Sequence, residues 1–263
     1  MSGCHLVPPL PTEHGATSVL VVGLLTPVSL AIAAGVNWTI SVLGSYLLFV
    51  TLAVGTMLYR AAVRRYRLAD GPRKRYYATY GAVEGTVVVL AIAGLVALQG
   101  PEWGVALVAL PGVVAELRYR GQGSSVPLLD VVMGVLGLSV LVPAGALIVG
   151  IEARSAVASL FVLFAAYHVL ATYRVKTVMK RSRERSDTST TRWLMPFVVV
   201  LLVVVAGWSL DVLGVAAPIL FLVSTVRTGK LAAASESPST KRLGRSEAFL
   251  SLLFVLGAPW LLP

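Results

Sequence analysis

The chain is poor in the residue types on which soluble enzymes and disulfide-stabilised domains depend. Only 13% of its 263 residues are charged, whereas soluble domains average about 25%. Its single cysteine, Cys4, excludes an internal disulfide and a cysteine metal cluster. The sequence has three histidines and contains no nucleophile elbow, Walker loop, HExxH motif or CxxC pair. The sequence therefore predicts no metal site and no familiar catalytic constellation.

Long apolar stretches take the place of those motifs. The chain is 57% hydrophobic, and its mean hydropathy is +0.83. Because a bilayer-spanning helix needs about 20 apolar residues, we predict an all-α integral membrane protein with about nine transmembrane helices. Residues 1–15 are expected to form a cytoplasmic N-terminal segment, and residues 16–262 a single polytopic membrane domain. The predicted spans are 16–34, 39–59, 78–98, 103–117, 128–149, 156–173, 193–208, 210–226 and 247–262.

The positive charge is distributed unevenly between the segments that separate these spans. If the chain starts inside, 21 of its 22 Lys and Arg residues fall on the inner side, and the outer side holds only Arg154. Basic segments resist translocation, so this bias predicts a cytoplasmic N-terminus and an outer C-terminus in the plasma membrane. An eight-span alternative, in which 193–226 is one span, would move the basic segment Arg227–Arg245 outside. The net charge of +10 is thus assigned to anionic lipid and not to nucleic acid.

Ionisable side chains within or beside the spans concentrate in the predicted inner half. An acid or imidazole inside a bilayer is costly and marks a functional site by default. Glu84 is the deepest of them and is flanked by Gly81 and Gly85. Residues near helix ends have a second explanation, because they can reach the interface by snorkelling or complement the helix dipole. The catalytic or proton-handling candidates are Glu13, His14, Glu84, His168 and Glu247, and Glu116 and Asp130 are candidates for a structural polar cluster.

The sequences at the inner ends of two predicted spans are similar. Residues 58–60 (LYR) close the second span and residues 172–174 (TYR) close the sixth, 114 residues later. Both run into a basic segment. Four spans of separation preserve orientation, so a pair of parallel four-helix repeats followed by one helix is predicted. The alternative is that tyrosine and arginine are simply common at inner span ends.

Two terminal motifs carry a family resemblance. Pro11–Ala16 (PTEHGA), leading into the first span, resembles the P-x-E-H-G-A-W opening of the YwiC-like family of membrane proteins. Lys241–Glu247 (KRLGRSE) resembles the K-R-[IL]-G-x-x-E motif before that family's last helix. Arg73–Gly81 and Ala115–Leu117 extend the similarity across most of the chain, while Thr17 stands where the family has tryptophan. This family supplies no established activity to transfer.

A more remote likeness is to the UbiA-type intramembrane prenyltransferases. Their nine helices, two four-helix parts and functional loops after spans two and six match the predicted layout and its two long basic loops. Their aspartate-rich motifs, which hold magnesium against a diphosphate, have no counterpart here. The loop 60–75 offers only Asp70, and the loop 174–192 only Glu184 and Asp187. The likeness thus implies a UbiA-like scaffold with degenerate metal motifs, and it leaves catalysis and magnesium dependence open.

These observations lead to three functional hypotheses. The first is a protein that binds an amphiphilic anion, such as a prenyl phosphate, a quinone precursor or a lipid, in a cytoplasm-facing polar cavity. The second is a transporter or permease in which Glu84 and His168 relay protons. The third is a non-catalytic subunit of a larger membrane complex. Under the first hypothesis, the anionic head is expected to meet Arg75, Arg174, Lys241 and Arg242.

Overall fold

The computed structural model describes residues 14–99, 135–151, 154–184, 190–234 and 239–262. Within these ranges the chain forms α-helices and a short 3-10 helix, and they contain no strand, which confirms the all-α prediction for the described residues. The helices are α1 (His14–Ala33), α2 (Ile40–Leu68), α3 (Gly71–Gln99), α7 (Leu141–Ile148), α8 (Arg154–Glu184), α9 (Thr190–Ser209), α10 (Ala216–Ala233), α11 (Thr240–Gly257) and η2 (Ala258–Trp260).

Four helical segments are long and apolar enough to cross a bilayer, which indicates a membrane protein. They are Ile40–Leu68, Gly71–Gln99, Ser155–Met179 and Ala216–Ala233. Leu20–Ala33, Val135–Ile148 and Trp193–Ser209 form shorter apolar helices. The fourth predicted span, 103–117, and the start of the fifth, 128–149, lie outside the described residues, so the number of spans stays a prediction.

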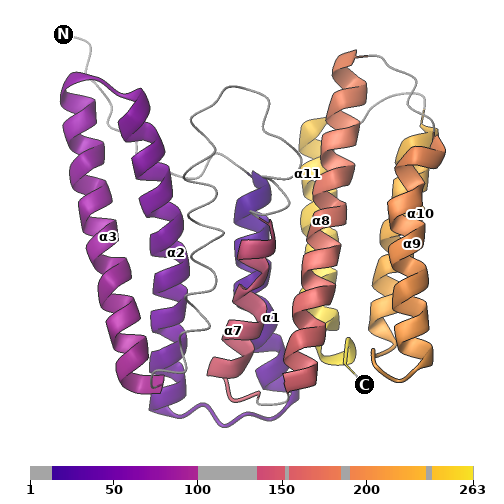
Figure 1. The fold of residues 1–263 in the computed structure, drawn as a ribbon, viewed down its shortest axis with the longest axis horizontal. Coiled ribbons are helices and arrows are strands. Elements are labelled where there is room, and N and C mark those ends of the chain that lie inside the picture. Colours follow the sequence, from indigo (N-terminus) through magenta and orange to yellow (C-terminus); the bar gives the residue numbers. More distant parts are fainter. Residues whose placement is uncertain (1–13, 100–134, 152–153, 185–189, 235–238, 263) are drawn as a thin grey trace.

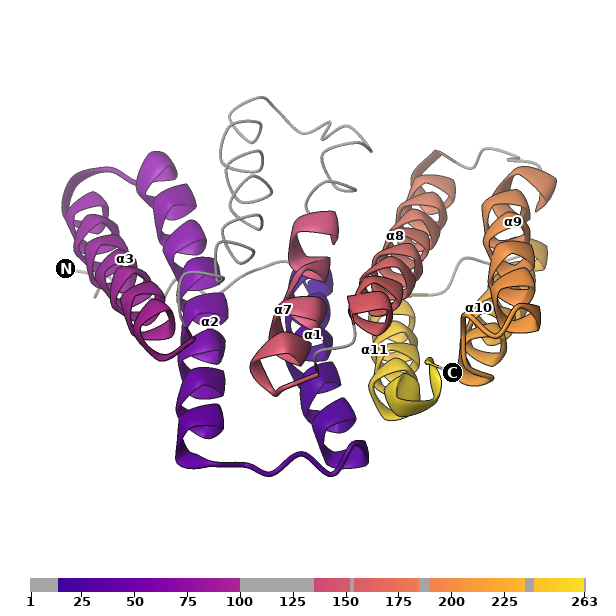
Figure 2. The same ribbon diagram turned by 60° about the horizontal axis from the view of Figure 1, so that its bottom comes forward.

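The helices are arranged as two hairpins flanking a central group. Helices α2 and α3 pack together at one edge, and α9 and α10 pack together at the other (Figures 1 and 2). Between them, α1 packs against α7 and α11, and α7 packs against α8. The largest buried apolar cluster joins Phe164 of α8, Phe197 of α9, Phe221 of α10 and Phe254 of α11. The centre and the C-terminal half thus share one core.

The long helices extend beyond the predicted spans. Helix α2 ends at Leu68, α3 begins at Gly71 and α8 continues to Glu184. Hydropathy marks only the apolar part of a helix, whereas Arg and Lys are good helix formers and continue it into the polar region. A sharp turn joins α2 to α3, with Ala69 in extended backbone and Gly71 at φ +57°, a left-handed conformation that glycine adopts without strain.

The eighth predicted span, 210–226, begins too early. Residues 210–215 form a turn between α9 and α10, in which Asp211 has φ +56°, and the helix starts only at Ala216. The backbone N–H of Gly214 in this turn donates to the carbonyl oxygen of Leu261 at 2.8 Å. The turn therefore also holds the segment after α11, an interaction that hydropathy does not report.

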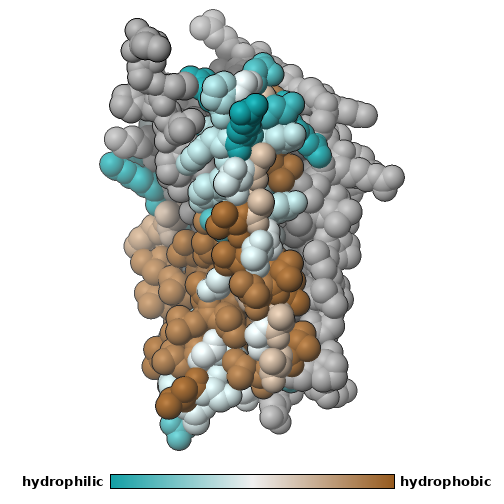
Figure 3. Space-filling view, turned by 90° about the vertical axis from the view of Figure 1, so that its left-hand side faces the viewer, coloured by the Kyte–Doolittle hydropathy of each residue, from teal (hydrophilic) through white to brown (hydrophobic). Residues whose placement is uncertain are grey.

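All the described basic segments meet at one end of the fold, which we call the basic end. It contains the ends of α2, α8 and α10 and the starts of α3, α9 and α11 (upper end of Figure 1). Figure 3 shows the side formed by the α2–α3 hairpin, whose surface is apolar along most of its length and hydrophilic toward the basic end. Exposed apolar side chains of α3 include Val83, Val89 and Leu90. Such a surface suits a bilayer that ends at a polar interface.

Small residues let α2 and α3 approach closely. A Cβ at Gly81 would lie 3.6 Å from the Cβ of Ala62, and one at Gly85 would lie 3.5 Å from the ring of Tyr59. Both glycines therefore face α2, as expected from their four-residue spacing.

Candidate functional site

The most buried charge in the described structure is Arg174 of α8, whose relative exposure is 1%. Its Nε and Nη2 donate to the two carboxylate oxygens of Glu247 on α11, at 2.9 and 2.7 Å. Its Nη1 donates toward the hydroxyls of Ser224 and Thr228 on α10 and the carbonyl oxygen of Ser224, at 2.8, 3.0 and 3.1 Å. This fork geometry is the strongest pairing available to guanidinium and carboxylate. The arrangement ties three helices together near the basic end.

A second arginine shares the same carboxylate. Nη1 of Arg227 on α10 lies 2.9 Å from Oε1 of Glu247, although it lacks the alignment of a hydrogen bond. Nη2 of Arg227 donates to the hydroxyl of Ser246. Two guanidinium groups therefore share one carboxylate, and the group carries a formal charge of +1. We call Arg174, Arg227 and Glu247 the charged triad.

Aromatic side chains adjoin the triad on the side of the core. The Tyr167 ring packs against Phe254 at 5.3 Å between centroids, and the His168 ring stacks on Phe164 at 4.1 Å. Nδ1 of His168 lies 3.0 Å from the Phe164 carbonyl oxygen, so this nitrogen donates to it. The Tyr167 hydroxyl and His168 Nε2 are buried without a hydrogen-bond partner among the described residues. His168 thus belongs to an aromatic cluster beside the triad.

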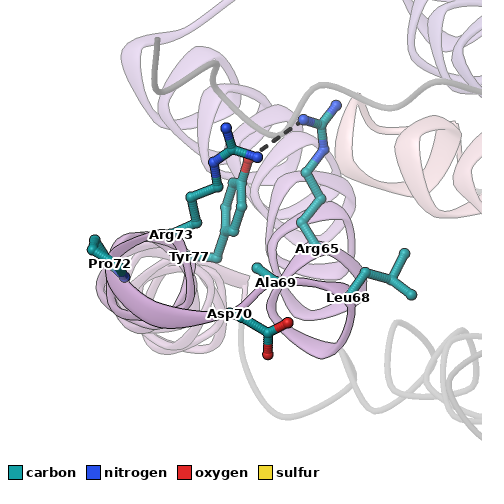
Figure 4. Close-up of a pocket in the computed structure, with 7 residues that line it drawn as sticks. All are labelled: Arg65, Leu68, Ala69, Asp70, Pro72, Arg73 and Tyr77. Carbon is teal, nitrogen blue, oxygen red and sulfur yellow. Dashed lines mark hydrogen bonds between the residues drawn. The ribbon is translucent and has the colours of Figure 1, made fainter. Parts of the chain in front are cut away.

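An open, basic groove lies at the turn between α2 and α3 (Figure 4). Its volume is about 700 Å³, within the range of roughly 300–1,000 Å³ typical of small-molecule sites. The guanidinium groups of Arg65 and Arg73 lie close to the Tyr77 hydroxyl, and Arg65 Nη1 donates to it at 3.5 Å. The Asp70 carboxylate points away from both arginines. The groove is lined by Arg65, Leu68, Ala69, Asp70, Pro72, Arg73 and Tyr77.

Further cation–aromatic contacts surround this groove. The Arg65 guanidinium lies 6.0 Å from the centroid of the Tyr77 ring, and the Lys74 ammonium lies 5.1 Å from that of Tyr66. Tyr76 packs edge-on against Tyr77. Tyrosines with basic neighbours are typical of the level at which a membrane meets water. The groove therefore combines positive charge, hydrogen-bond donors and apolar surface.

The structure brings together some of the predicted site residues and separates others. Arg174 and Glu247 form one ion pair, although the sequence assigned them to different roles. Glu84 lies on α3 with its carboxylate over Gly55 of α2, on the far side of α1 and α7 from α11 (Figures 1 and 2). Arg75 and Arg242 are exposed at the basic end. Glu13, Glu116 and Asp130 lie outside the described residues, as do the side chains of His14 and Lys241.

Sequence reasoning did not single out Arg227 or Arg65. Each was treated only as one charge in a basic segment. The available signal was position within an apolar helix, because Arg227 lies six residues before the end of α10.

Among the described residues, no group of three or more His, Cys, Asp and Glu side chains is placed to hold a metal ion. Comparisons of the chain with protein-family models, curated proteins and solved structures found no match.

Proposed function

We propose that this chain is a multipass membrane protein that binds an amphiphilic anion at its basic end, with the head in the α2–α3 groove. The observation that carries the proposal is the pair of guanidinium groups, Arg65 and Arg73, gathered at the Tyr77 hydroxyl beside Leu68 and Pro72. Cations and a phenol complement a phosphate or carboxylate head. The neighbouring exposed apolar surface complements a hydrocarbon tail.

The membrane arrangement belongs to the same proposal. We infer nine spans in the plasma membrane with the basic end in the cytoplasm, because Lys and Arg favour the cytoplasmic side. The remote likeness to UbiA-type enzymes supports a ligand with a lipid-like tail, whereas the resemblance to YwiC-like proteins supports the membrane class alone. The loop after the second predicted span carries function in the UbiA-type enzymes, and the groove lies in the corresponding segment here, where α2 and α3 meet.

The groove also changes which residues we expect to hold the head. The sequence favoured Arg174, but this side chain is saturated by Glu247, Ser224 and Thr228. An incoming anion would have to displace the Glu247 carboxylate from the fully buried Arg174 guanidinium, which costs more than binding at an open groove. Arg65 is half-buried and opens onto the groove, so it takes over the predicted role.

Binding of dodecyl phosphate to the full-length protein in phosphatidylcholine nanodiscs tests this function. Thermal-shift titrations should show binding of dodecyl phosphate and not of dodecanol. Arg65→Gln should weaken binding by about tenfold, because a hydrogen bond to a charged group contributes about 1.5–3 kcal/mol. Arg245→Gln, which removes one exposed charge from α11 at the same end, should change affinity less than twofold. Equal weakening by both variants, or equal binding of the alcohol, would contradict the groove as the site.

A further inference from the structure

The charged triad contains more hydrogen-bond donors than acceptors. Both Glu247 oxygens already accept from Arg174, and the Ser224 and Thr228 hydroxyls accept from Arg174 Nη1. Among the described residues, the only hydrogen bond donated by Arg227 goes to Ser246. A guanidinium has five N–H donors in a planar fork. Nη1 of Arg227 is paired with Glu247 at 2.9 Å and Nη2 donates to Ser246, so the remaining donors of Arg227 have no acceptor among the described residues.

A second unused donor lies in the same region. The Tyr167 hydroxyl is buried beside Ser251 and makes no well-aligned hydrogen bond among the described residues. Tyr167 interacts electrostatically with Glu247, Arg174 and Arg227, which places it at the triad. Buried donors without acceptors are costly. The complement of this region is therefore a group rich in acceptor oxygens.

The charge and exposure of Arg227 also favour an anionic partner. Two guanidinium groups share one carboxylate, which leaves one positive charge uncompensated within the triad. The Arg174 side chain is 0% exposed, whereas the Arg227 side chain is 18% exposed and reaches the surface of the protein. Arg227 lies six residues before the end of α10, or about 9 Å along the helix axis. The exposed cations Lys230, Arg242 and Arg245 lie around this end.

We propose that Arg227 is the centre of a second anion site, which binds an oxyanion of the phosphate class between α10 and α11. Glu247 and Ser246 hold the guanidinium in place, and the exposed part of the Arg227 side chain meets the anion. Phosphate oxygens fit the planar fork of arginine better than the ammonium of lysine. The oxyanion comes either from free phosphate or from the headgroup of an anionic lipid. This site is separate from the α2–α3 groove and does not depend on it.

Two binding measurements on the full-length protein distinguish the two sources. In phosphatidylcholine nanodiscs, inorganic phosphate is titrated and thermal stabilisation is recorded. In nanodiscs that contain phosphatidylglycerol and no free phosphate, native mass spectrometry records the lipid retained. Binding in the first measurement identifies free phosphate, and retention only in the second identifies the lipid headgroup. No binding to the wild-type protein in either measurement would overturn the proposal.

Variants then test whether Arg227 itself makes the site. Arg227→Gln should weaken binding about tenfold or more, and Arg227→Lys should also weaken it because the charge remains while the fork is lost. Lys230→Gln is the matched control, since it removes an exposed charge one turn later on the same helix. Arg65→Gln should leave this site unchanged, which separates it from the groove. Wild-type affinity in Arg227→Gln, or an equal loss in Lys230→Gln, would overturn the proposal. If Arg227→Gln does not fold, Arg227→Lys decides by the same criteria.

Discussion

Removal of the Glu247 carboxylate is expected to be among the most destabilising single changes in the described structure. Glu247 is the only carboxylate in the charged triad, and its side chain is 14% exposed. Glu247→Ala leaves the fully buried guanidinium of Arg174 without its two charge-assisted hydrogen bonds. The Ser224 and Thr228 hydroxyls still accept from Arg174 but do not neutralise its charge.

The size of the effect follows from burial. Breaking a buried ion pair by removing one partner costs about 3–5 kcal/mol of unfolding free energy, because the remaining charge is left uncompensated. Total stabilities of folded proteins are only about 5–15 kcal/mol. Glu247→Ala should therefore remove a large fraction of the stability. Arg174→Met in the Glu247→Ala background should restore part of it, because the fully buried charge is then gone and only the partly exposed Arg227 is left without the carboxylate.

Reversible unfolding by SDS in mixed micelles, followed by tryptophan fluorescence, measures these differences. Asp211→Asn is the control, because Asp211 is exposed in the turn after α9 and should shift the free energy by less than about 0.5 kcal/mol. A loss below about 1 kcal/mol for Glu247→Ala would refute the reasoning. So would a double variant that is less stable than the single one.

Two further predictions concern packing and membrane orientation. Gly214→Ala should destabilise the protein by about 1–3 kcal/mol, because the new Cβ would lie 2.2 Å from the Trp260 carbonyl oxygen. The control is Gly244→Ala, whose Cβ would meet nothing within 4 Å. This variant should be neutral or stabilising in the same unfolding assay. Cysteine labelling in intact cells tests orientation, using single cysteines at the two ends of α8 in a background without Cys4. Arg154→Cys should react with an impermeant maleimide from outside and Arg183→Cys should not; the reverse pattern would place the basic end outside.

The coarse architecture could be predicted from sequence because bilayer physics acts locally. Within the described ranges the long apolar stretches are helical, and the segments that carry the basic residues of Arg60–Arg75 and Arg227–Arg245 meet at one end of the fold. The spacing of Gly81 and Gly85 also predicted close packing, since residues four apart share a helix face. Element ends were less predictable. The turn before Ala216 is as apolar as a helix, and its geometry depends on a contact with Leu261.

The site was less predictable because its contacts are not local. Arg174 and Glu247 are 73 residues apart, and no periodicity links them. From composition alone, a basic residue at a span end is expected to be available to bind an anion. In the structure, however, Arg174 is paired with Glu247, Ser224 and Thr228. Glu84 is a second case, since it is partly buried in α3 and its carboxylate lies over Gly55 of α2, away from Glu247 on α11. Which cations remain available depends on pairing in three dimensions.

The order of the triad along the chain has a consequence for biosynthesis. Arg174 and Arg227 are translated before Glu247, so both cationic segments reach the insertion machinery while their counter-ion is still inside the ribosome. Partition of α8 into lipid with an unneutralised guanidinium is unfavourable. We therefore expect α8 and α10 to pack stably only once α11 has supplied Glu247, and chains truncated upstream of Glu247 to be less stable than the full chain.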